Sequence, residues 1–249
     1  MRVDVLTLFP DILEGVLGRS ILGRAVEQGL IDVNLVNIRD FADGPHRVTD
    51  EPPFGGGAGM VIKPEPVYRA VESLRGLNSL ERIVLLTPQG RRLTQDIVKD
   101  MAASPDLVLV CGRYEGVDER IRTGLATDEI SIGDYVLSGG EVPALVVIEA
   151  VSRMIPGVVG RRESVEEDSF YGGLLGYPQY TRPREFRGMA VPETLLSGDH
   201  ERIRLWRMKQ AVRRTLDRRP DMVETQRFEK EVLDLIKQVQ TERDAGEVS

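Results

Sequence analysis

Two periods of hydrophobic and polar positions alternate along the first 160 residues of the chain. Short apolar or alternating runs are typical of strands, whereas apolar positions three and four residues apart are typical of helices. The predicted strands are Arg2–Leu8, Ile31–Ile38, Arg82–Leu86, Asp106–Val110 and a short run at 128–132. The predicted helices between them are Asp11–Gln28, Glu65–Leu74, Thr94–Ala102, which Thr94 could cap, and Pro143–Ile155.

Strands that alternate with helices predict an α/β fold, with a mostly parallel sheet covered by helices on both faces. The polar segment 161–170 interrupts this pattern and is predicted to be an interdomain linker. Two amphipathic helices follow it, the first beginning near Ser197 or Asp199. Their apolar faces carry Leu205, Met208, Val212 and Leu216 in the first helix, and Phe228, Val232, Leu235, Ile236 and Val239 in the second. We therefore expect an α/β domain over 1–160 and a small all-helical domain over 171–249.

Three glycine-bearing segments follow predicted strands, namely Leu85–Gly90, Val110–Gly116 and Ser131–Pro143. Glycine allows tight bends and lets bare backbone approach a ligand closely. Because the carboxyl ends of parallel strands meet at one edge of a sheet, such loops can form a small-molecule pocket there. Three ordinary turns would give the same spacing, so the pattern alone leaves both interpretations open. A further segment, 39–60, is unusually long for a connection without regular structure and is therefore a candidate functional loop.

Composition excludes several classes of protein. The chain of 249 residues has a single cysteine and two histidines, so an intrachain disulfide and a Cys/His metal cluster are both ruled out. No apolar run approaches the roughly 18 residues that span a bilayer, and the alternating start of the chain does not resemble a signal peptide. We expect a cytoplasmic protein with no membrane partner.

The charge of the chain is unevenly distributed. The net charge is −7, which argues against general coating of nucleic acid, yet residues 200–219 hold eight Lys and Arg against two acids. Such a basic stripe can hold phosphate groups, although a charged run is more often a solvated helix face. Both interpretations stay open on charge alone.

Familiar catalytic motifs are absent from the sequence. The run Gly55–Gly59 is followed by Met60 and does not open a helix after a strand, so the dinucleotide-binding fingerprint fails. No Gly-Lys pair exists for a phosphate-binding Walker loop, and His200-Glu201 lacks the second histidine of a zinc protease. No G-x-S-x-G elbow occurs either.

The sequence resembles the bacterial tRNA (guanine-N1)-methyltransferases of the SPOUT superfamily, from Leu6 to about Arg219. The segments that carry the resemblance are Leu6–Pro10, Gly55–Met60, Leu86–Gly90, Cys111–Gly116, Ser131–Glu141, Ser152–Gly157, Glu167–Phe170, Tyr180–Pro183 and Leu196–Gly198. The resemblance implies methyl transfer from S-adenosyl-L-methionine to N1 of the guanine immediately 3′ of the tRNA anticodon, which supports reading-frame maintenance. It also implies a homodimer with composite active sites and a deep trefoil knot, although knots are rare among folds.

The resemblance assigns the cofactor to the three glycine loops. The implied cofactor-binding residues are Pro88, Gly112, Tyr114, Glu115, Ile132, Gly133, Asp134, Tyr135, Val136, Leu137, Gly139 and Gly140. Backbone groups of these loops can hydrogen-bond the adenine edge, Leu137 and Ile132 can cover its face, and nearby acids tolerate a sulfonium cation.

By the same resemblance Asp168 is the general base and Arg153 its supporting arginine. A free aspartate has a pKa of about 3.9, far below that of guanine N1, so the carboxylate cannot remove the N1 proton unaided. Partial burial of Asp168 would raise its pKa, and Arg153 or a Mg²⁺ ion would stabilise charge on guanine O6. Glu115 and Asp168 are the candidate Mg²⁺ ligands. Without the resemblance, Asp168 would be read as part of a solvated acidic run.

Other residues are assigned more loosely. His46 and Asp50 of the long loop could touch the target base or stabilise the loop, and Phe170 could stack near a flipped guanine. The resemblance also favours tRNA-backbone contacts for Arg182, Arg184 and the basic stripe. Two alternatives remain open: a SPOUT-type methyltransferase acting on another RNA position, and a non-catalytic tRNA-binding factor.

Overall fold

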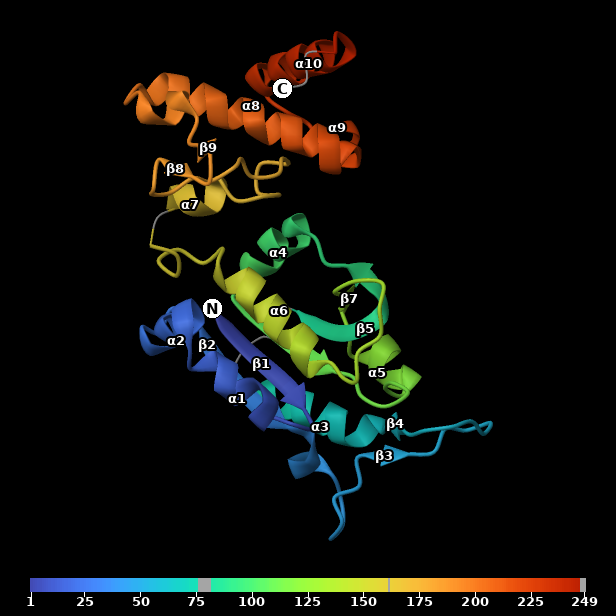
Figure 1. The fold of residues 1–249 in the computed structure, drawn as a ribbon. Coiled ribbons are helices and arrows are strands. Elements are labelled where there is room, and N and C mark those ends of the chain that lie inside the picture. Colours follow the sequence, from blue (N-terminus) through green and yellow to red (C-terminus); the bar gives the residue numbers. More distant parts are fainter. Residues whose placement is uncertain (76–81, 161, 247–249) are drawn as a thin grey trace. The chain divides into compact units, whose positions relative to one another are not determined.

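The computed structural model describes residues 1–75, 82–160 and 162–246. The chain divides into two compact units, Met1–Arg162 and Glu163–Ser249. The first unit contains a parallel sheet and its flanking helices, and the second unit is mainly helical (Figure 1). Within the described ranges, no helix is both long enough and apolar enough to cross a membrane.

The five-stranded sheet of the first unit has the order β2-β1-β6-β5-β7, and every neighbouring pair is parallel. Its strands are β1 (Arg2–Thr7), β2 (Asp32–Asn37), β5 (Ile83–Arg92), β6 (Asp106–Cys111) and β7 (Asp128–Ser131). All six residues of the central strand β6 are buried, as expected for a strand covered on both faces. The predicted parallel α/β sheet is therefore confirmed.

Two hydrophobic cores fill the two faces of this sheet. On β6, Leu107 and Leu109 belong to one core, and Val108 and Val110 to the other, because successive side chains of a strand point to opposite faces. The first core is closed by α1 (Asp11–Leu17), α2 (Ser20–Glu27), α4 (Gln95–Ala102) and α6 (Glu141–Ser152). The second is closed by α3 (Pro64–Arg75), α5 (Glu119–Gly124) and a 3₁₀ turn at Ile38–Phe41.

Several boundaries differ from those predicted. The single helix expected over 11–28 is two helices, because α1 ends at Gly18 and Arg19 is extended as the N-cap of α2. Strand β5 runs past Leu86 to Arg92, with an irregularity between Leu86 and Arg91 where it pairs with β7. Helix α6 begins at Glu141, two residues before Pro143, and ends at Ser152. The predicted cap of α4 is present, since the Thr94 hydroxyl accepts from the Ile97 N–H.

Helix α5 was not predicted from the sequence. It spans six residues, and Ile121 is its single buried apolar residue, so it shows no apolar period. The Asp118 side chain caps it by accepting from the Arg120 N–H. A capped helix this short cannot be predicted from hydrophobic periodicity.

A two-stranded arm leaves the sheet within the long segment 39–60 and its C-terminal flank. It is formed by β3 (Asp50–Glu51) and β4 (Val61–Ile62), which pair antiparallel. Figure 1 shows this arm projecting away from the five-stranded sheet. Most of segment 39–60 is irregular, as predicted, apart from the end of the 3₁₀ turn and β3.

The second unit is organised around α8 (His200–Arg218), α9 (Pro220–Thr225) and α10 (Lys230–Asp244). Its core contains Val212, Leu216, Ile236 and Val239 from the two predicted apolar faces. Asp199 caps α8 at the predicted start, whereas Leu205 is exposed rather than part of the core. Three further elements of this unit were not predicted: the small hairpin of β8 (Glu185–Phe186) and β9 (Met189–Ala190), helix α9, and the 3₁₀ turn Glu193–Leu196. The segment expected to be a linker includes α7 (Arg162–Glu166).

Candidate functional site

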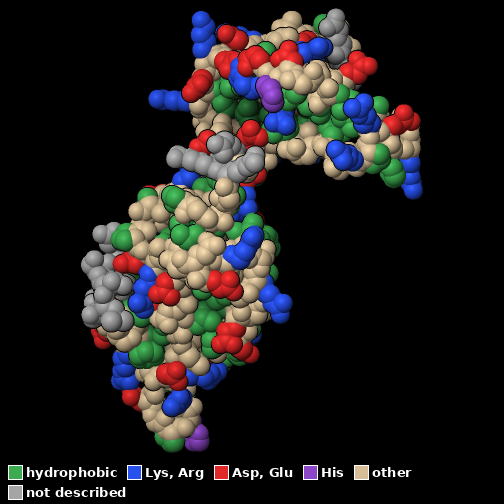
Figure 2. Space-filling view, turned by 90° about the vertical axis from the view of Figure 1, so that its left-hand side faces the viewer, with side chains coloured by type: hydrophobic (Ala, Val, Ile, Leu, Met, Phe, Trp, Pro, Cys, Tyr) green, Lys and Arg blue, Asp and Glu red, His purple; other side chains and the backbone are tan. Residues whose placement is uncertain are grey.

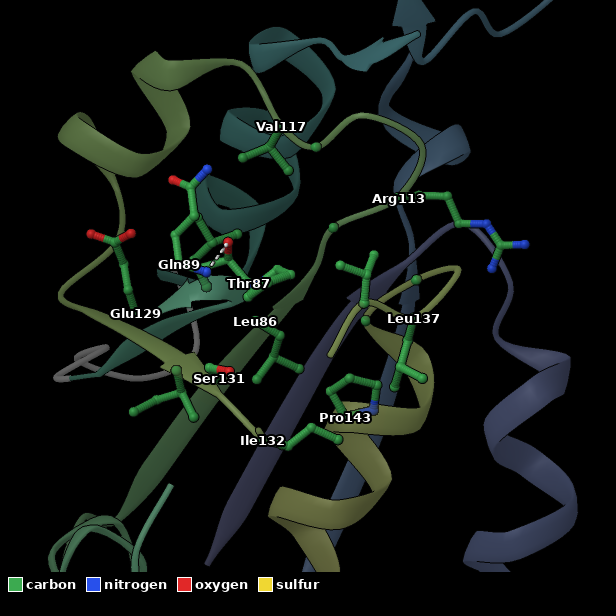
Figure 3. Close-up of a pocket in the computed structure, with 18 of the residues that line it drawn as sticks. Leu86, Thr87, Gln89, Arg113, Val117, Glu129, Ser131, Ile132, Leu137 and Pro143 are labelled. Carbon is green, nitrogen blue, oxygen red and sulfur yellow. Dashed lines mark hydrogen bonds between the residues drawn. The ribbon is translucent and has the colours of Figure 1, made fainter. Parts of the chain in front are cut away.

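A cavity of about 470 Å³ lies beside residues 85–89 within β5 and at the carboxyl ends of β6 and β7. Its walls come from the three glycine-bearing segments singled out in the sequence, at Thr87–Gln89, Gly112–Val117 and Ile132–Gly140. Figure 3 shows Leu86, Ile132, Leu137 and Pro143 approaching one another on one side of the cavity. The volume falls within the range of small-molecule sites, roughly 300–1,000 Å³.

Backbone conformation shapes the loop after β6. Tyr114 adopts a φ of +59°, and Gly116 a φ of +126°, which lies in the region that favours glycine. The Gly112 carbonyl accepts from the Gly140 N–H at 2.8 Å, and Arg113 and Gly139 form an isolated antiparallel bridge. The loops after β6 and β7 are therefore joined by their backbones along one wall of the cavity.

The loop after β7 is held by short local contacts. The Ser131 hydroxyl donates to the Gly133 carbonyl at 2.9 Å, and the Tyr135 hydroxyl donates to the Ile132 carbonyl at 3.3 Å. Gly133 has a φ of +154°. Val136 and Leu137 remain largely exposed in the single chain. Apolar side chains that border a cavity while facing solvent are available to cover a flat ligand.

A buried carboxylate, that of Glu141, holds residues of the cavity wall in place. Glu141 is 2% exposed and stands at the first position of α6. Its oxygens accept from the Thr7 hydroxyl at 2.8 Å and from the Arg113 guanidinium at 3.3 Å. The Arg113 guanidinium also lies 4.3 Å from the centroid of the Phe9 ring. Burial, together with the nearby Glu141 charge, raises the pKa of the Cys111 thiol.

Three carboxylates line the cavity and differ in their pairing. Arg122 pairs with both Glu119 and Glu129, so these two carboxylates share one cationic partner. The Arg122 hydrogen bond lowers the pKa of Glu119. Glu115 is exposed and forms no ion pair with the residues that the structure describes. It is therefore the carboxylate best placed to face a cationic ligand.

The structure brings together nearly all the residues assigned to cofactor binding. Pro88, the loop residues after β6 and those after β7 line the cavity, with the exception of Asp134. Asp134 is exposed and pairs with Arg92 instead. Gln89, Arg122 and Glu129 line the cavity without having been predicted. Gln89 lies within β5, Arg122 within α5 and Glu129 near the start of β7, so no motif of the sequence indicated them.

The two residues assigned to catalysis belong to different units. Arg153 is half-buried at the C-terminus of α6 in the first unit. Asp168 is exposed in the single chain and lies in a turn after α7 of the second unit, where its N–H donates to the Val165 carbonyl at 3.3 Å. Its own unit therefore does not bury the Asp168 carboxylate. Phe170, with a φ of +74°, follows in the same turn and is 45% exposed.

The basic stripe of 200–219 is largely paired within the second unit. Arg204 pairs with Glu201 and Glu231, and both Lys209 and Arg213 pair with Glu242. Arg219 and Arg207 are also engaged, the former with Asp221 and the latter over the Tyr177 ring. Figure 2 shows acidic and basic side chains side by side over this unit. The excess of positive charge in the sequence therefore does not form a continuous basic face on the side shown.

Metal ligands do not gather in the described part of the chain. Among residues 1–75, 82–160 and 162–246, no three His, Cys, Asp or Glu side chains are arranged to hold a metal ion. A site that uses Glu115 alone would need its other ligands from water, substrate or another unit.

The fold and the cavity define an α/β protein with a parallel sheet and a cavity of small-molecule size beside β5, β6 and β7. Residues 1–225 match the sequence profile of the family described as tRNA (Guanine-1)-methyltransferase TrmD. The chain belongs to this family, and the resemblance seen in the sequence is confirmed.

Individual relatives agree with the family match. A tRNA (guanine-N(1)-)-methyltransferase of Moorella thermoacetica is 56% identical over 225 residues, covering 90% of each chain. The protein of the same description from Pelotomaculum thermopropionicum is 53% identical over 241 residues, covering 96% of each. That of Desulforamulus reducens is 52% identical over 233 residues, covering 93% of this chain and 92% of its own.

Proposed function

We propose that this protein transfers a methyl group from S-adenosyl-L-methionine to N1 of the guanine immediately 3′ of the tRNA anticodon. The single observation that carries the proposal is the cavity of three glycine loops in a chain of the TrmD family. Family membership makes the chain a tRNA (guanine-N1)-methyltransferase, whereas the donor's site and the position within the tRNA are our own inference.

The cavity fits a bent methyl donor. Its backbone groups supply donors and acceptors for an adenine edge, and Ile132 and Leu137 supply an apolar surface for the face of the ring. S-adenosylmethionine, when bound, supplies an electrophilic methyl group on a sulfonium centre. The uncompensated carboxylate of Glu115 would stabilise that positive charge, because opposite charges at short range attract strongly away from bulk water.

Proton removal from guanine N1 falls to Asp168. The carboxylate would accept the N1 proton while the Arg153 guanidinium stabilises the negative charge that develops on guanine O6. Asp168 is exposed in the single chain, so exclusion of water from around its carboxylate must come from another surface. The arrangement supports a composite site in which a second copy contributes.

A homodimer is supported by an apolar surface of the first unit. Ile12 and Val16 of α1 and Val142 and Val146 of α6 are each between 41% and 52% exposed, and these two helices contact each other. Neighbouring exposed apolar residues on packed helices mark an interaction surface. The same surface continues from α6 into the loop after β7 that lines the cavity.

A trefoil knot is consistent with close backbone crossings beside the cavity. A Cβ at Gly140 would lie 2.6 Å from the Cα of Cys111, and a Cβ at Gly90 would lie 2.4 Å from the Ile130 nitrogen. Glycine is needed where two chain segments pass this closely. Segments threaded through one another require such crossings, so we infer that the knot of the family is present.

Phosphate binding by the second unit would fall to the arginines that its acids do not neutralise. Arg182, Arg184, Arg202 and Arg218 form no ion pair with the residues that the structure describes. Arg207 and Arg214 form none either, but Arg207 lies over the Tyr177 ring and Arg214 donates to the Gly176 carbonyl. We therefore assign tRNA-backbone contacts to the first four rather than to the whole stripe. Mg²⁺ takes one or two carboxylates and otherwise keeps water or substrate oxygens, so we propose Glu115 and Asp168 as the residues that would hold it.

The test is methyl transfer from labelled donor to tRNA, with the methylated position mapped by primer extension. Asp168→Asn should keep donor binding by calorimetry and lose turnover by roughly 10²-fold to 10⁴-fold. Glu166→Gln, in the same exposed segment, should remain active. Methylation at another nucleotide would assign a different SPOUT-type activity, and tRNA binding without donor binding would indicate a non-catalytic factor. An active Asp168→Asn variant would remove Asp168 as the base.

A further inference from the structure

Phe54 is the most exposed large hydrophobic side chain in the described part of the molecule. It is 102% exposed, against 82% for Val136, the next in order. Phe54 lies between the two strands of the arm, β3 and β4, and not over either hydrophobic core. Transfer of a phenyl ring from water to a binding partner is favourable, so this side chain is available for a contact outside its own chain.

The backbone on either side of Phe54 holds its ring in solvent. Pro52 and Pro53 precede Phe54 and restrict the approach of the chain, and the Gly56 N–H donates to the Pro53 carbonyl at 3.3 Å. Each of the glycines that follow has a positive φ, at Gly55, Gly56, Gly57 and Gly59. Other residues rarely adopt this conformation. The sequence around Phe54 therefore specifies a turn with an aromatic ring at its tip.

The arm that carries Phe54 is fixed to the wall of the cavity. The Glu115 N–H donates to the Met60 carbonyl at 3.0 Å, and the Ile62 N–H donates to the Gly116 carbonyl at 3.0 Å. Gly59 packs so closely that a Cβ there would lie 2.5 Å from a carboxylate oxygen of Glu115. The arm and the loop after β6 are thus one hydrogen-bonded structure. Whatever approaches the cavity along this side meets the arm.

The charged residues of the arm indicate which kind of ligand Phe54 would contact. Arg47 and Lys63 flank the arm, but residues 48–62 between them include Asp50 and Glu51 and no Lys or Arg. The tip itself therefore carries no cation for a phosphate group. An aromatic ring without cations suits the face of an unstacked base, since bases of single-stranded RNA loops stack on aromatic side chains. The substrate tRNA of the proposed function is the ligand that would bring unpaired bases to the cavity.

We propose that Phe54 stacks on an unpaired base in the loop of the substrate tRNA and so holds the loop beside the cavity. The inference rests on the proposed function, because only a tRNA substrate would bring the unpaired bases of its loop to the cavity beside the arm. A second copy of the chain is the competing occupant of the tip, and the experiment separates the two.

The experiment compares Phe54→Ala, Phe54→Leu and Phe54→Tyr in the full chain. Phe54→Ala should raise the KM for tRNA roughly tenfold to a hundredfold, the loss expected for one base–aromatic stack. The Kd for S-adenosylmethionine and the mass in solution should not change. Phe54→Tyr should restore the KM because it keeps the ring, whereas Phe54→Leu should not. Leu233→Ala, which removes another exposed apolar side chain from α10, is the matched control and should behave as the unsubstituted protein.

A direct signal accompanies the kinetics. A 2-aminopurine placed at each unpaired position of the tRNA loop in turn should be quenched at one position by the unsubstituted protein and not by Phe54→Ala. An unchanged KM in Phe54→Ala, or full rescue by leucine, would overturn the stacking contact. A change in mass would instead assign the tip to a second copy. Methyl transfer absent from the unsubstituted protein would refute the proposed function, and the quenching would still report on Phe54.

Discussion

The Thr7 hydroxyl donates to the buried carboxylate of Glu141 at 2.8 Å, across 134 residues of sequence. Thr7 ends strand β1, which lies beside the central strand β6, and its hydroxyl also accepts from the Phe9 N–H at 2.9 Å. On its other oxygen Glu141 accepts from Arg113, in the cavity loop after β6. One carboxylate therefore ties the end of a core strand to two of the three loops that form the cavity.

Replacing this carboxylate should affect both stability and donor binding. Glu141→Gln keeps the size of the side chain but loses the charge that holds Arg113, and a partly broken buried network costs about 1–3 kcal/mol. Chemical denaturation should show this loss, and calorimetry should show weaker binding of S-adenosylmethionine because the Arg113–Gly139 wall is no longer held.

Thr7→Val provides the matched control for Glu141→Gln. It removes one hydrogen bond to Glu141 but leaves the ion pair with Arg113 intact, so it should weaken donor binding less than Glu141→Gln does. Wild-type donor affinity in a folded Glu141→Gln variant would show that Glu141 has no part in positioning the cavity loops.

Gly140→Ala should disrupt the cavity. A Cβ at this position would lie 2.6 Å from the Cα of Cys111 and 3.0 Å from the Gly112 nitrogen, which are backbone atoms that cannot swing aside. Overpacking of this kind costs about 1–3 kcal/mol or more, and the two loops must separate to relieve it. Thermal unfolding should show a lower midpoint, and donor binding should be lost. Gly18→Ala, whose Cβ meets nothing within 4 Å, should be tolerated; equal behaviour of the two variants would contradict the close crossing.

Cys111 offers a probe of the same crossing. It is the single cysteine of the chain and is 1% exposed. Because burial and the charge of Glu141 raise the pKa of its thiol, both access and thiolate formation disfavour reaction. A disulfide reagent should therefore label the native protein far more slowly than the denatured protein, with one thiol released per chain on unfolding. Prompt labelling of the native protein at neutral pH would mean that the end of β6 opens readily.

The sheet and the cavity loops could be predicted from the sequence, but the side chains that pair with one another could not. Residues 107–111 of strand β6 form an uninterrupted apolar run, and glycine marks the cavity loops. Both features can therefore be predicted from short stretches of sequence. The role of Glu141 cannot, because its partners Thr7 and Arg113 become neighbours only when the sheet forms. Asp134 shows the converse: it lies within a cavity loop, yet its side chain turns to Arg92.

The basic stripe shows the same limit for charge. Counting residues 200–219 alone predicts a strongly positive helix, but α10 brings Glu231 and Glu242 against α8 from outside that window. Local net charge therefore overstated the positive surface of α8.

The pairing of Glu242 with Lys209 and Arg213 should make the second unit sensitive to acid. Hydrogen bonds from these two cations lower the pKa of Glu242 from 4.5 to about 2. A carboxyl whose folded pKa lies below its unfolded pKa stabilises the fold fully above the unfolded value, and that contribution disappears as pH falls through the folded value. The relevant window therefore runs from about pH 4.5 down to about pH 2.

Glu242→Gln tests this linkage. Because Trp206 is the single tryptophan and stands in α8, its fluorescence during heating reports on the helix that pairs with Glu242. The variant should unfold at a lower temperature than the unsubstituted protein at pH 6, and the two curves should converge as pH approaches 2.5. Added salt should reduce the difference at pH 6, since exposed ion pairs are screened. Asp234→Asn, which changes an exposed acid of α10 with no ion pair in the described residues, should show no such convergence; a constant gap between Glu242→Gln and the unsubstituted protein across the whole range would refute the assigned pairing.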